Sequence, residues 1–335
     1  MKQACHVVLI LMGMAVGVTG CKSSAKTAGG DSARPRGVDQ YIAGVQLYKK
    51  GDKDGARSQL VEATRLNPNL IMPRIMLGDM YRDEGKYDDA VKQFERVTKM
   101  DPYYASNWYK LGVGYQLGQK LKQAAASYQR ALDLKPDDSK SNMNLGLVYL
   151  YTGDRDKALA YAQKATEMDP SSAAAWSNLG ITYDARGEYA RGEEAYRKSV
   201  DLDPDNPASL ANLATNLMAQ NKGSDAAEIM KRAVGISNTP ALRKRYGDAL
   251  AKAERYDQAV QQYNEALKLD PRYYPAMNEI GFARITQFRK GFDMDDSKRT
   301  DALAMWKKSL DVNQNQPKVE AAIKQWAQGA QNLSQ

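Results

Sequence analysis

Apolar and small residues recur along the chain with a period of 34 residues from Val38 onward. The step is marked by prolines that follow an alternation of apolar and polar residues, at Pro68, Pro102, Pro136, Pro170 and Pro204, with Pro271 after a further 67 residues. Proline lacks the backbone donor and clashes with the preceding helical turn, so each marks the end of a helix. A small residue keeps nearly the same step, at Gly44, Gly78, Gly112, Gly146, Gly180, Ala214, Gly247 and Gly281. The pattern predicts about eight tandem repeats.

Within each repeat, the spacing of small and large residues predicts two packed helices. A second small series follows twelve residues after the first, at Ala56, Ala90, Ala124, Ala158, Gly192, Ala226 and Ala259. Large residues such as Leu111 and Tyr115 flank the first small residue, and packing large against small side chains fills a core. Glycines at positions 51, 85, 153 and 187 stand where a left-handed residue would end the first helix. Each unit is expected to be helix, tight turn, helix.

This pattern resembles the tetratricopeptide repeat, whose Trp, Leu-Gly, Tyr, Ala, Phe, Ala and Pro positions are matched by Trp108, Leu111-Gly112, Tyr115, Ala124, Tyr128, Ala131 and Pro136. The resemblance covers about four fifths of the chain and implies an all-α solenoid of about eight helix-turn-helix repeats, wound as a right-handed superhelix. Residues 37–273 are expected to form seven regular repeats, residues 274–316 a divergent eighth repeat with an insertion, and residues 317–335 a capping helix that seals the apolar end. The sixth repeat departs from the pattern at Ala214, Asn221 and Asn238.

The insertion, Asp293 to Thr300, contains alternating carboxylates of the kind that bind calcium. The glycine and the bidentate glutamate of a calcium loop are absent, so a solvated loop ending in a helix N-cap is the better interpretation. No metal and no other cofactor is expected.

The strongest indication of a binding site is a series of asparagines, Asn144, Asn178 and Asn212, spaced 34 residues apart on the first helices of three repeats. Stacked repeats would place them one above another on the inner surface, where an amide offers both donor and acceptor to an extended peptide. Similar asparagine ladders line the superhelix of the O-linked N-acetylglucosamine transferase family. The alternative is that each asparagine bonds within its own helix.

Two further features bear on partner binding. Chaperone-type tetratricopeptide domains hold a C-terminal carboxylate with five polar residues, of which only Asn212 and Arg245 have counterparts here, since Ser177, Ile181 and Ala241 occupy the other places. That clamp is therefore absent, and Arg245 is kept as a candidate peptide-binding residue. Doubled tyrosines at 103–104 and 273–274 fall in turns between repeats, where only one of each pair is expected to be buried, so they are weaker candidates for partner contact.

The N-terminus is of another kind. An apolar run from Val7 to Val18 is too short to span a membrane and suits a signal peptide, residues 1–20. It leads into Val18-Thr19-Gly20-Cys21, which resembles the lipobox of bacterial lipoproteins and implies that Cys21 is acylated after cleavage. The alternative is an ordinary signal peptide with an incidental cysteine. Residues 21–36 are expected to be the lipidated cysteine and a flexible tether, and Lys22 favours the outer membrane, facing the periplasm.

Composition then narrows the function. The only histidine, His6, and the other cysteine, Cys5, would leave with the signal peptide. A mature chain without His or a free thiol lacks the commonest general base, nucleophile and metal ligands, so an enzyme is not expected. No basic stripe with interleaved aromatics indicates nucleic acid, and no small-molecule substrate is expected.

The sequence thus predicts a non-catalytic scaffold or adaptor that is anchored to a bacterial envelope membrane and binds proteins or extended peptides in the concave groove. The alternatives are a pilotin-like assembly factor for a secretin or pilus system and, less favoured, a transferase-associated array.

Overall fold

The computed structural model describes residues 34–291 and 295–332, and within these ranges the chain forms helices and turns without strands. The helices are α1 Val38–Lys49, α2 Lys53–Leu66, α3 Ile71–Asp83, α4 Tyr87–Met100, α5 Ala105–Leu117, α6 Leu121–Leu134, α7 Ser139–Thr152, α8 Arg155–Met168, α9 Ala173–Ala185, α10 Tyr189–Leu202, α11 Pro207–Ala219, α12 Gly223–Ile236, α13 Pro240–Lys252, α14 Tyr256–Leu269, α15 Tyr274–Lys290, α16 Asp296–Val312 and α17 Pro317–Asn332. None of them is long and apolar enough to cross a membrane.

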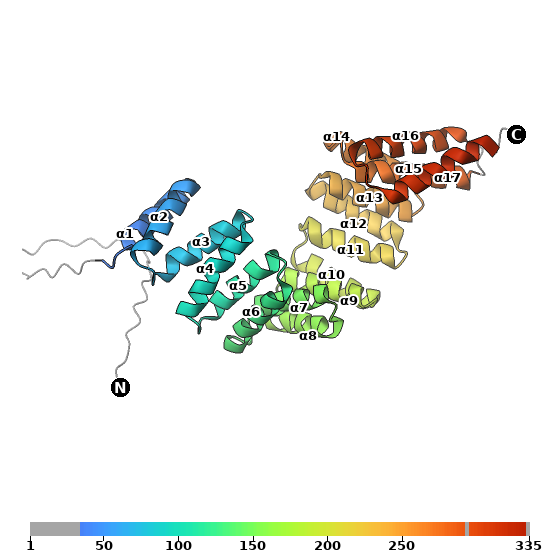
Figure 1. Cartoon of the computed structure of the whole chain (residues 1–335). Coiled ribbons are helices and arrows are strands. Elements are labelled where there is room, and N and C mark those ends of the chain that lie inside the picture. The colour runs from blue at the N-terminus through green and yellow to red at the C-terminus, as the bar shows by residue number, and fades with distance from the viewer. Residues whose placement is uncertain (1–33, 292–294, 333–335) are drawn as a thin grey trace, which may run out of the picture.

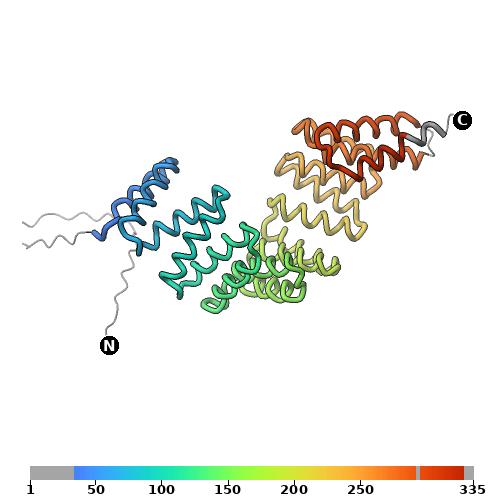
Figure 2. Tube along the Cα trace, in the orientation of Figure 1, coloured from blue at the N-terminus to red at the C-terminus, as the bar shows by residue number. Residues whose placement is uncertain are grey.

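The first sixteen helices pair into eight hairpins, numbered here as repeats 1 to 8, from α1–α2 to α15–α16. Figure 1 shows the repeats following one another along an elongated, curved array, and the trace in Figure 2 runs through them in chain order. From the fourth repeat onward the first helices also contact one another in series, α7 with α9, α9 with α11, α11 with α13 and α13 with α15. The predicted all-α solenoid is confirmed.

Prolines end the second helices as predicted. The helix α4 ends at Met100, two residues before Pro102, and α6 ends at Leu134, two before Pro136. Repeat 6 has no proline at Asn238, and there the chain uses a different signal. The Thr239 side chain accepts a hydrogen bond from the backbone of Leu242, and Pro240 occupies the first turn of α13, where its missing N–H costs nothing. The boundary is thus made by the start of the next helix.

Close packing inside each repeat depends on the pairing of a small residue in the first helix with a large one in the second. A Cβ added to the first-helix glycine would lie 2.3–2.7 Å from an aromatic ring in four repeats, in the pairs Gly78–Phe94, Gly112–Tyr128, Gly180–Tyr196 and Gly247–Tyr263. Repeat 6 instead pairs Ala214 with Met230, both fully buried. A flexible thioether can make room for a methyl group that an aromatic ring cannot, which explains why alanine is tolerated at this one step.

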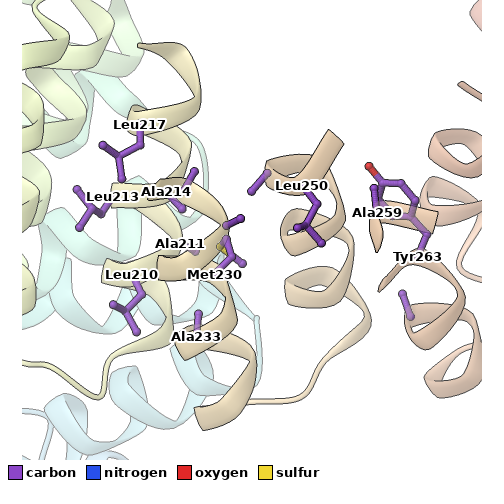
Figure 3. Close-up of a cluster of buried hydrophobic side chains, with 14 of the residues drawn as sticks. Leu210, Ala211, Leu213, Ala214, Leu217, Met230, Ala233, Leu250, Ala259 and Tyr263 are labelled. Atoms are coloured by element: carbon purple, nitrogen blue, oxygen red, sulfur yellow. The ribbon is translucent and has the colours of Figure 1, made fainter. Parts of the chain in front are cut away.

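The core built in this way is continuous through repeats 6 and 7. Figure 3 shows Leu210, Leu213 and Leu217 of α11 beside Met230 of α12, with Leu250 and Tyr263 extending the cluster into the next repeat. The helix α17 closes the C-terminal end by packing on α16, and Val319 is buried there. It is the predicted capping helix.

Tight turns join the two helices of each repeat through a residue with positive φ. In repeats 1, 2, 4 and 5 this residue is a glycine, with φ between 75° and 88°. In repeats 3, 6 and 7 it is Gln119, Asn221 or Glu254, with φ of 60° to 63°. A side chain other than glycine raises the energy of this conformation, and asparagine does so least.

Gln119→Gly should therefore stabilise the protein by about 1 kcal/mol, because it removes the Cβ that the left-handed conformation disfavours. Gln119→Ala is the matched control, since it removes the same polar group and keeps the Cβ. Denaturant unfolding should show the gain for glycine alone. Equal stability of the two variants would show that the turn is not strained.

The eighth repeat corrects the prediction for the insertion. Residues 293–300 were expected to form a loop, but α15 and α16 each extend to 17 residues and residues 296–300 are helical. The expected N-cap is present, because the Asp295 side chain accepts a hydrogen bond from the backbone of Ser297. Asp293 lies outside the described residues. The nine extra residues lengthen the hairpin, and Trp306 still packs over Gly281, with its indole N–H donated to the Asn278 carbonyl.

Candidate functional site

The predicted asparagine series lies on the first helices of repeats 4, 5 and 6, with Asn144 in α7, Asn178 in α9 and Asn212 in α11. These three helices contact one another in sequence. All three side chains are half-buried. The amides therefore follow one another along one face of the array, which we call the first-helix face.

Two of the three amides bond to the preceding repeat. The Asn144 amide nitrogen donates to the Tyr109 hydroxyl at 3.3 Å, and the Asn212 amide nitrogen donates to the Ser177 hydroxyl at 3.2 Å. Neither side chain bonds to its own helix, which was the alternative interpretation. Asn178 makes no side-chain hydrogen bond to another residue that the structure describes.

Asn178 and Asn212 line a common hollow of about 300 Å³ between α9 and α11, which we call the amide groove. Its other walls are Ala173, Ala174, Ser177, Ile181, Asp203, Asn206, Ala208 and Ser209. The small side chains on both helices leave the groove open. Asn144 does not line it, so the structure brings together two of the three predicted asparagines at one groove.

A polar cluster that the sequence analysis missed holds α9 against α11 close to this groove. The Asn216 amide nitrogen donates to the Asp184 carboxylate at 2.6 Å and to the Tyr189 carbonyl at 3.0 Å. The other Asp184 oxygen accepts from the Tyr196 hydroxyl at 3.0 Å. Burial raises the pKa of Asp184 even though both hydrogen bonds lower it. Asn216 is itself fully buried, and a buried amide with satisfied partners fixes the geometry of its neighbours.

Gly192 is the sequence signal that pointed to this cluster. It replaces the alanine found at the same position of the other repeats, and a Cβ there would lie 2.5 Å from an Asp184 oxygen and 2.8 Å from the Asn216 nitrogen. The same junction also carries Glu193. Burial would raise the pKa of its carboxyl, but hydrogen bonds from Lys222, Arg197 and Gln220 lower that pKa to about 2.

Charged side chains border the first-helix face on its C-terminal side. Arg245 is exposed on α13, one repeat beyond Asn212, and forms no ion pair with the rest of the described chain. Beside it, the Lys244 ammonium lies 2.9 Å from an Asp248 oxygen and 3.7 Å from a Glu279 oxygen. Burial raises the pKa of Glu279. Arg245 is thus the accessible cation of this group.

On the N-terminal side, Lys110 of α5 bonds to Asp79 of α3 at 2.7 Å, and Arg82 bonds to the same carboxylate at 2.8 Å. Lys110 occupies the helix position that Asn144 occupies in the next repeat. The amide series is therefore bordered by charged residues at both ends, while the amide groove between α9 and α11 has one ionisable lining residue, Asp203.

A second hollow opens between the α4–α5 turn and the α6–α7 turn. It measures about 560 Å³ and is lined by Tyr103, Tyr104, Ala105, Ser106, Tyr109, Leu134, Lys135, Asp138 and Lys140. We call it the tyrosine hollow. The prediction that one tyrosine of each doubled pair is buried is wrong, because Tyr103 is 79% and Tyr104 59% exposed. In the other pair, Tyr273 and Tyr274 are both half-buried.

Several other predictions concern residues or sites outside these hollows. Cys21, the predicted lipidation site, lies outside the described residues. Over residues 34–291 and 295–332, no group of three or more His, Cys, Asp or Glu is arranged to bind a metal ion. The indole N–H of Trp108 donates to the Pro102 carbonyl at 2.9 Å and that of Trp176 to the Pro170 carbonyl at 2.9 Å. Both indoles, predicted as core, are half-buried and tie the first helix to the preceding turn.

Solved structures similar to this chain share its fold. A tetratricopeptide repeat protein from Parabacteroides merdae has a TM-score of 0.60 at 18% identity, over 70% of this chain and 93% of that one. A chain of the APC/C hetero-tetramer Cut9-Hcn1 has a TM-score of 0.59 at 15% identity, over 84% of this chain and 55% of that one. MamA protein is 25% identical, with a TM-score of 0.47, over 50% of this chain and 92% of its own. A search of curated proteins finds no match.

Family models match most of the repeats. Two models described as tetratricopeptide repeat match residues 75–139 and 143–207, and residues 185–244, and a third described as TPR repeat matches residues 247–287. Together they cover more than half of the chain and agree with the repeat boundaries of α3 to α15. The chain belongs to the tetratricopeptide repeat family.

Proposed function

We propose that this chain is an adaptor that binds an extended segment of another protein along the first-helix face, and that an acylated Cys21 holds it on a bacterial envelope membrane. The observation that carries the binding proposal is the amide groove, where Asn178 and Asn212 line one hollow between α9 and α11. Family membership supports the coarser conclusion of a protein-interaction scaffold.

The chemistry of the groove suits a polypeptide backbone. Each asparagine amide has donors and an acceptor, and the Asn212 nitrogen spends one donor on Ser177 while its carbonyl oxygen stays available. The Asn178 amide has both kinds of group to offer. Backbone N–H and C=O groups require such partners whenever a bound segment loses water. The small walls at Ala174 and Ala208 admit a main chain, and the Ile181 side chain adds apolar contact.

Charge then limits the kind of segment that fits. The amide groove contains Asp203 as its one ionisable lining residue, and Arg245 stands exposed one repeat further on. A buried unpaired charge on the partner would be costly in such a groove. We therefore propose that the partner lays an uncharged stretch across α9 and α11 and directs a carboxylate toward Arg245.

The membrane anchor is proposed from the sequence around Cys21. Two or more acyl chains on one residue make membrane attachment stable, since each buried CH₂ contributes about 0.8 kcal/mol. The described chain begins at Arg34, so residues 22–33 would form the link between the anchor and α1. We propose that the repeats face the periplasm from the outer membrane and recruit their partner there.

Site-directed photocrosslinking tests the binding proposal. A photoreactive phenylalanine analogue at Ala174, an exposed wall of the amide groove, should capture a defined protein in the cell envelope. The same analogue at Lys122, exposed on the second helix α6, is the control. Capture at residue 174 and none at 122 supports the proposal, and a secretin as the captured protein would select the pilotin-like alternative. Equal capture at both positions, or none at 174, contradicts a binding role for the groove.

A further inference from the structure

The tyrosine hollow is the larger of the two hollows described on the array, and it has an unusual wall. Tyr103 and Tyr104 stand in the turn between α4 and α5 with most of their surface in solvent. Leu134 and Tyr109 continue the apolar wall on the other side. Exposed aromatic side chains in a concave site are a common feature of protein-binding surfaces, because a rigid ring offers a large contact area at small entropic cost.

The fold does not require these tyrosines to be exposed. The corresponding turn before the eighth repeat also carries two tyrosines, but both are half-buried, and Tyr273 packs against the core of repeats 6 and 7. Other turns place polar or small residues there, such as Ser171 and Ser172 before α9. Packing of the repeats therefore does not explain the exposed pair before α5.

The polar groups around the hollow are mainly hydrogen-bond donors with positive charge. Lys140 is exposed and has no ion pair within the described chain, and the Lys135 ammonium lies 3.9 Å from an Asp138 oxygen. Asp138 is occupied as the N-cap of α7, where a carboxylate oxygen accepts from the Ser141 backbone at 2.9 Å. The hollow thus offers two ammonium groups and few free acceptors, and this favours a ligand with carboxylates.

We propose that the tyrosine hollow binds an aromatic or large apolar side chain of a partner peptide, with acidic residues beside it facing Lys135 and Lys140. This inference rests on the proposed function and adds a sequence preference to it. The hollow and the asparagine series are joined physically, because Tyr109 lines the hollow and its hydroxyl accepts from Asn144. A peptide anchored here can continue along α7 toward the amide groove.

An acidic saccharide is the competing ligand, because tyrosines also stack on sugar rings. A sugar needs acceptors for its many hydroxyl protons, and the one carboxylate that lines the hollow already caps α7. The enclosed volume of about 560 Å³ is more than one aromatic side chain requires and leaves room for its flanking backbone. The donor-rich lining favours the peptide.

The test measures fluorescence anisotropy of a labelled peptide with one Phe flanked by Glu residues, added to the full chain. Two companion peptides replace the Phe by Ala or the Glu residues by Lys. The protein variants are the double change Tyr103→Ala with Tyr104→Ala, and Lys140→Glu. Matched controls are Tyr151→Ala, which alters an equally exposed tyrosine outside the hollow, and Lys122→Glu, which makes the same charge change on α6.

We expect the Phe–Glu peptide to bind the parent, and the tyrosine and Lys140 variants each to weaken it about tenfold. Both controls should bind like the parent, and both companion peptides should bind at least about tenfold more weakly. Equal binding to all variants, tighter binding of the Lys peptide, or binding of an oligogalacturonate in place of the peptide would overturn the inference. Unchanged melting curves confirm that the variants are folded.

A further variant separates this inference from the proposed function. Asn178→Ala with Asn212→Ala alters the amide groove and leaves the hollow intact. If this variant alone loses the peptide, the groove binds and the hollow does not. If no variant or parent binds the peptide while residue 174 still captures a partner, the hollow inference fails and the proposed function stands.

Discussion

Gly180→Leu should lower the free energy of unfolding by about 2 kcal/mol or more. A Cβ at this position would lie 2.7 Å from the Tyr196 ring, far inside van der Waals contact, and a leucine adds three further carbons. The ring cannot move aside easily, because Tyr196 is 2% exposed and its hydroxyl is bonded to Asp184. Insertion therefore pushes α9 away from α10 and strains the Asp184 cluster as well.

Gly235→Leu is the matched control. Gly235 lies in α12 with no atom within 4 Å of an added Cβ, so leucine there should stabilise the helix slightly through its higher propensity. Denaturant unfolding of both variants gives the comparison. Because each repeat contacts mainly its neighbours, the loss in Gly180→Leu should fall mostly on repeats 4 to 6, and amide hydrogen exchange would locate it. Similar stability of the two variants would show that Gly180 is not a contact point between helices.

Gly146→Leu should destabilise for a different reason. The second helix of repeat 4 carries Ala162 where its neighbours carry an aromatic residue, and the two backbones approach more closely. A Cβ on Gly146 would lie 3.2 Å from the Ala158 carbonyl oxygen and 3.3 Å from the Ala162 nitrogen. Backbone atoms cannot rotate away, so the two helices must separate.

Cys21→Ser should release the protein almost completely from the membrane fraction. The proposed acyl chains are the sole anchor in this account, and no described helix is long and apolar enough to replace them. Cys5→Ser is the matched control, since Cys5 precedes the proposed cleavage point and would leave with the signal peptide. Cell fractionation followed by a high-salt wash measures the effect. A Cys21→Ser protein that stays with the membrane would rule out the lipid anchor.

Much of the fold could be predicted because a 34-residue repeat states the same physical requirement many times. The Gly112–Tyr128 contact needs a small residue and a large one at fixed spacing, and four repeats confirm that reading with an aromatic ring. The lengthened eighth repeat was harder. A register shift of nine residues breaks the period, and nothing in Asp295 or Asp296 indicates that the helix resumes there and not after Thr300.

The candidate site was predicted less completely, because a period fixes direction along the array but not which neighbours a side chain reaches. Equal spacing identified Asn144, Asn178 and Asn212, yet Asn144 bonds to Tyr109 and does not line the amide groove. Asn216 occurs once, so repetition gave no sign that it joins α9 to α11 through Asp184. The exposure of Tyr103 and Tyr104 depends on how two turns face each other, which the sequence does not encode locally.

The central claim is that a partner binds along the amide groove, and the affinity of the captured partner for Asn178→Ala with Asn212→Ala tests it most directly. Each lost amide pair contributes about 0.5 to 1.5 kcal/mol, so the double variant should bind roughly 5- to 100-fold more weakly. Asn144→Ala, one repeat away, should have a smaller effect. Circular dichroism and melting should match the parent. An unchanged affinity in a folded double variant would contradict the claim.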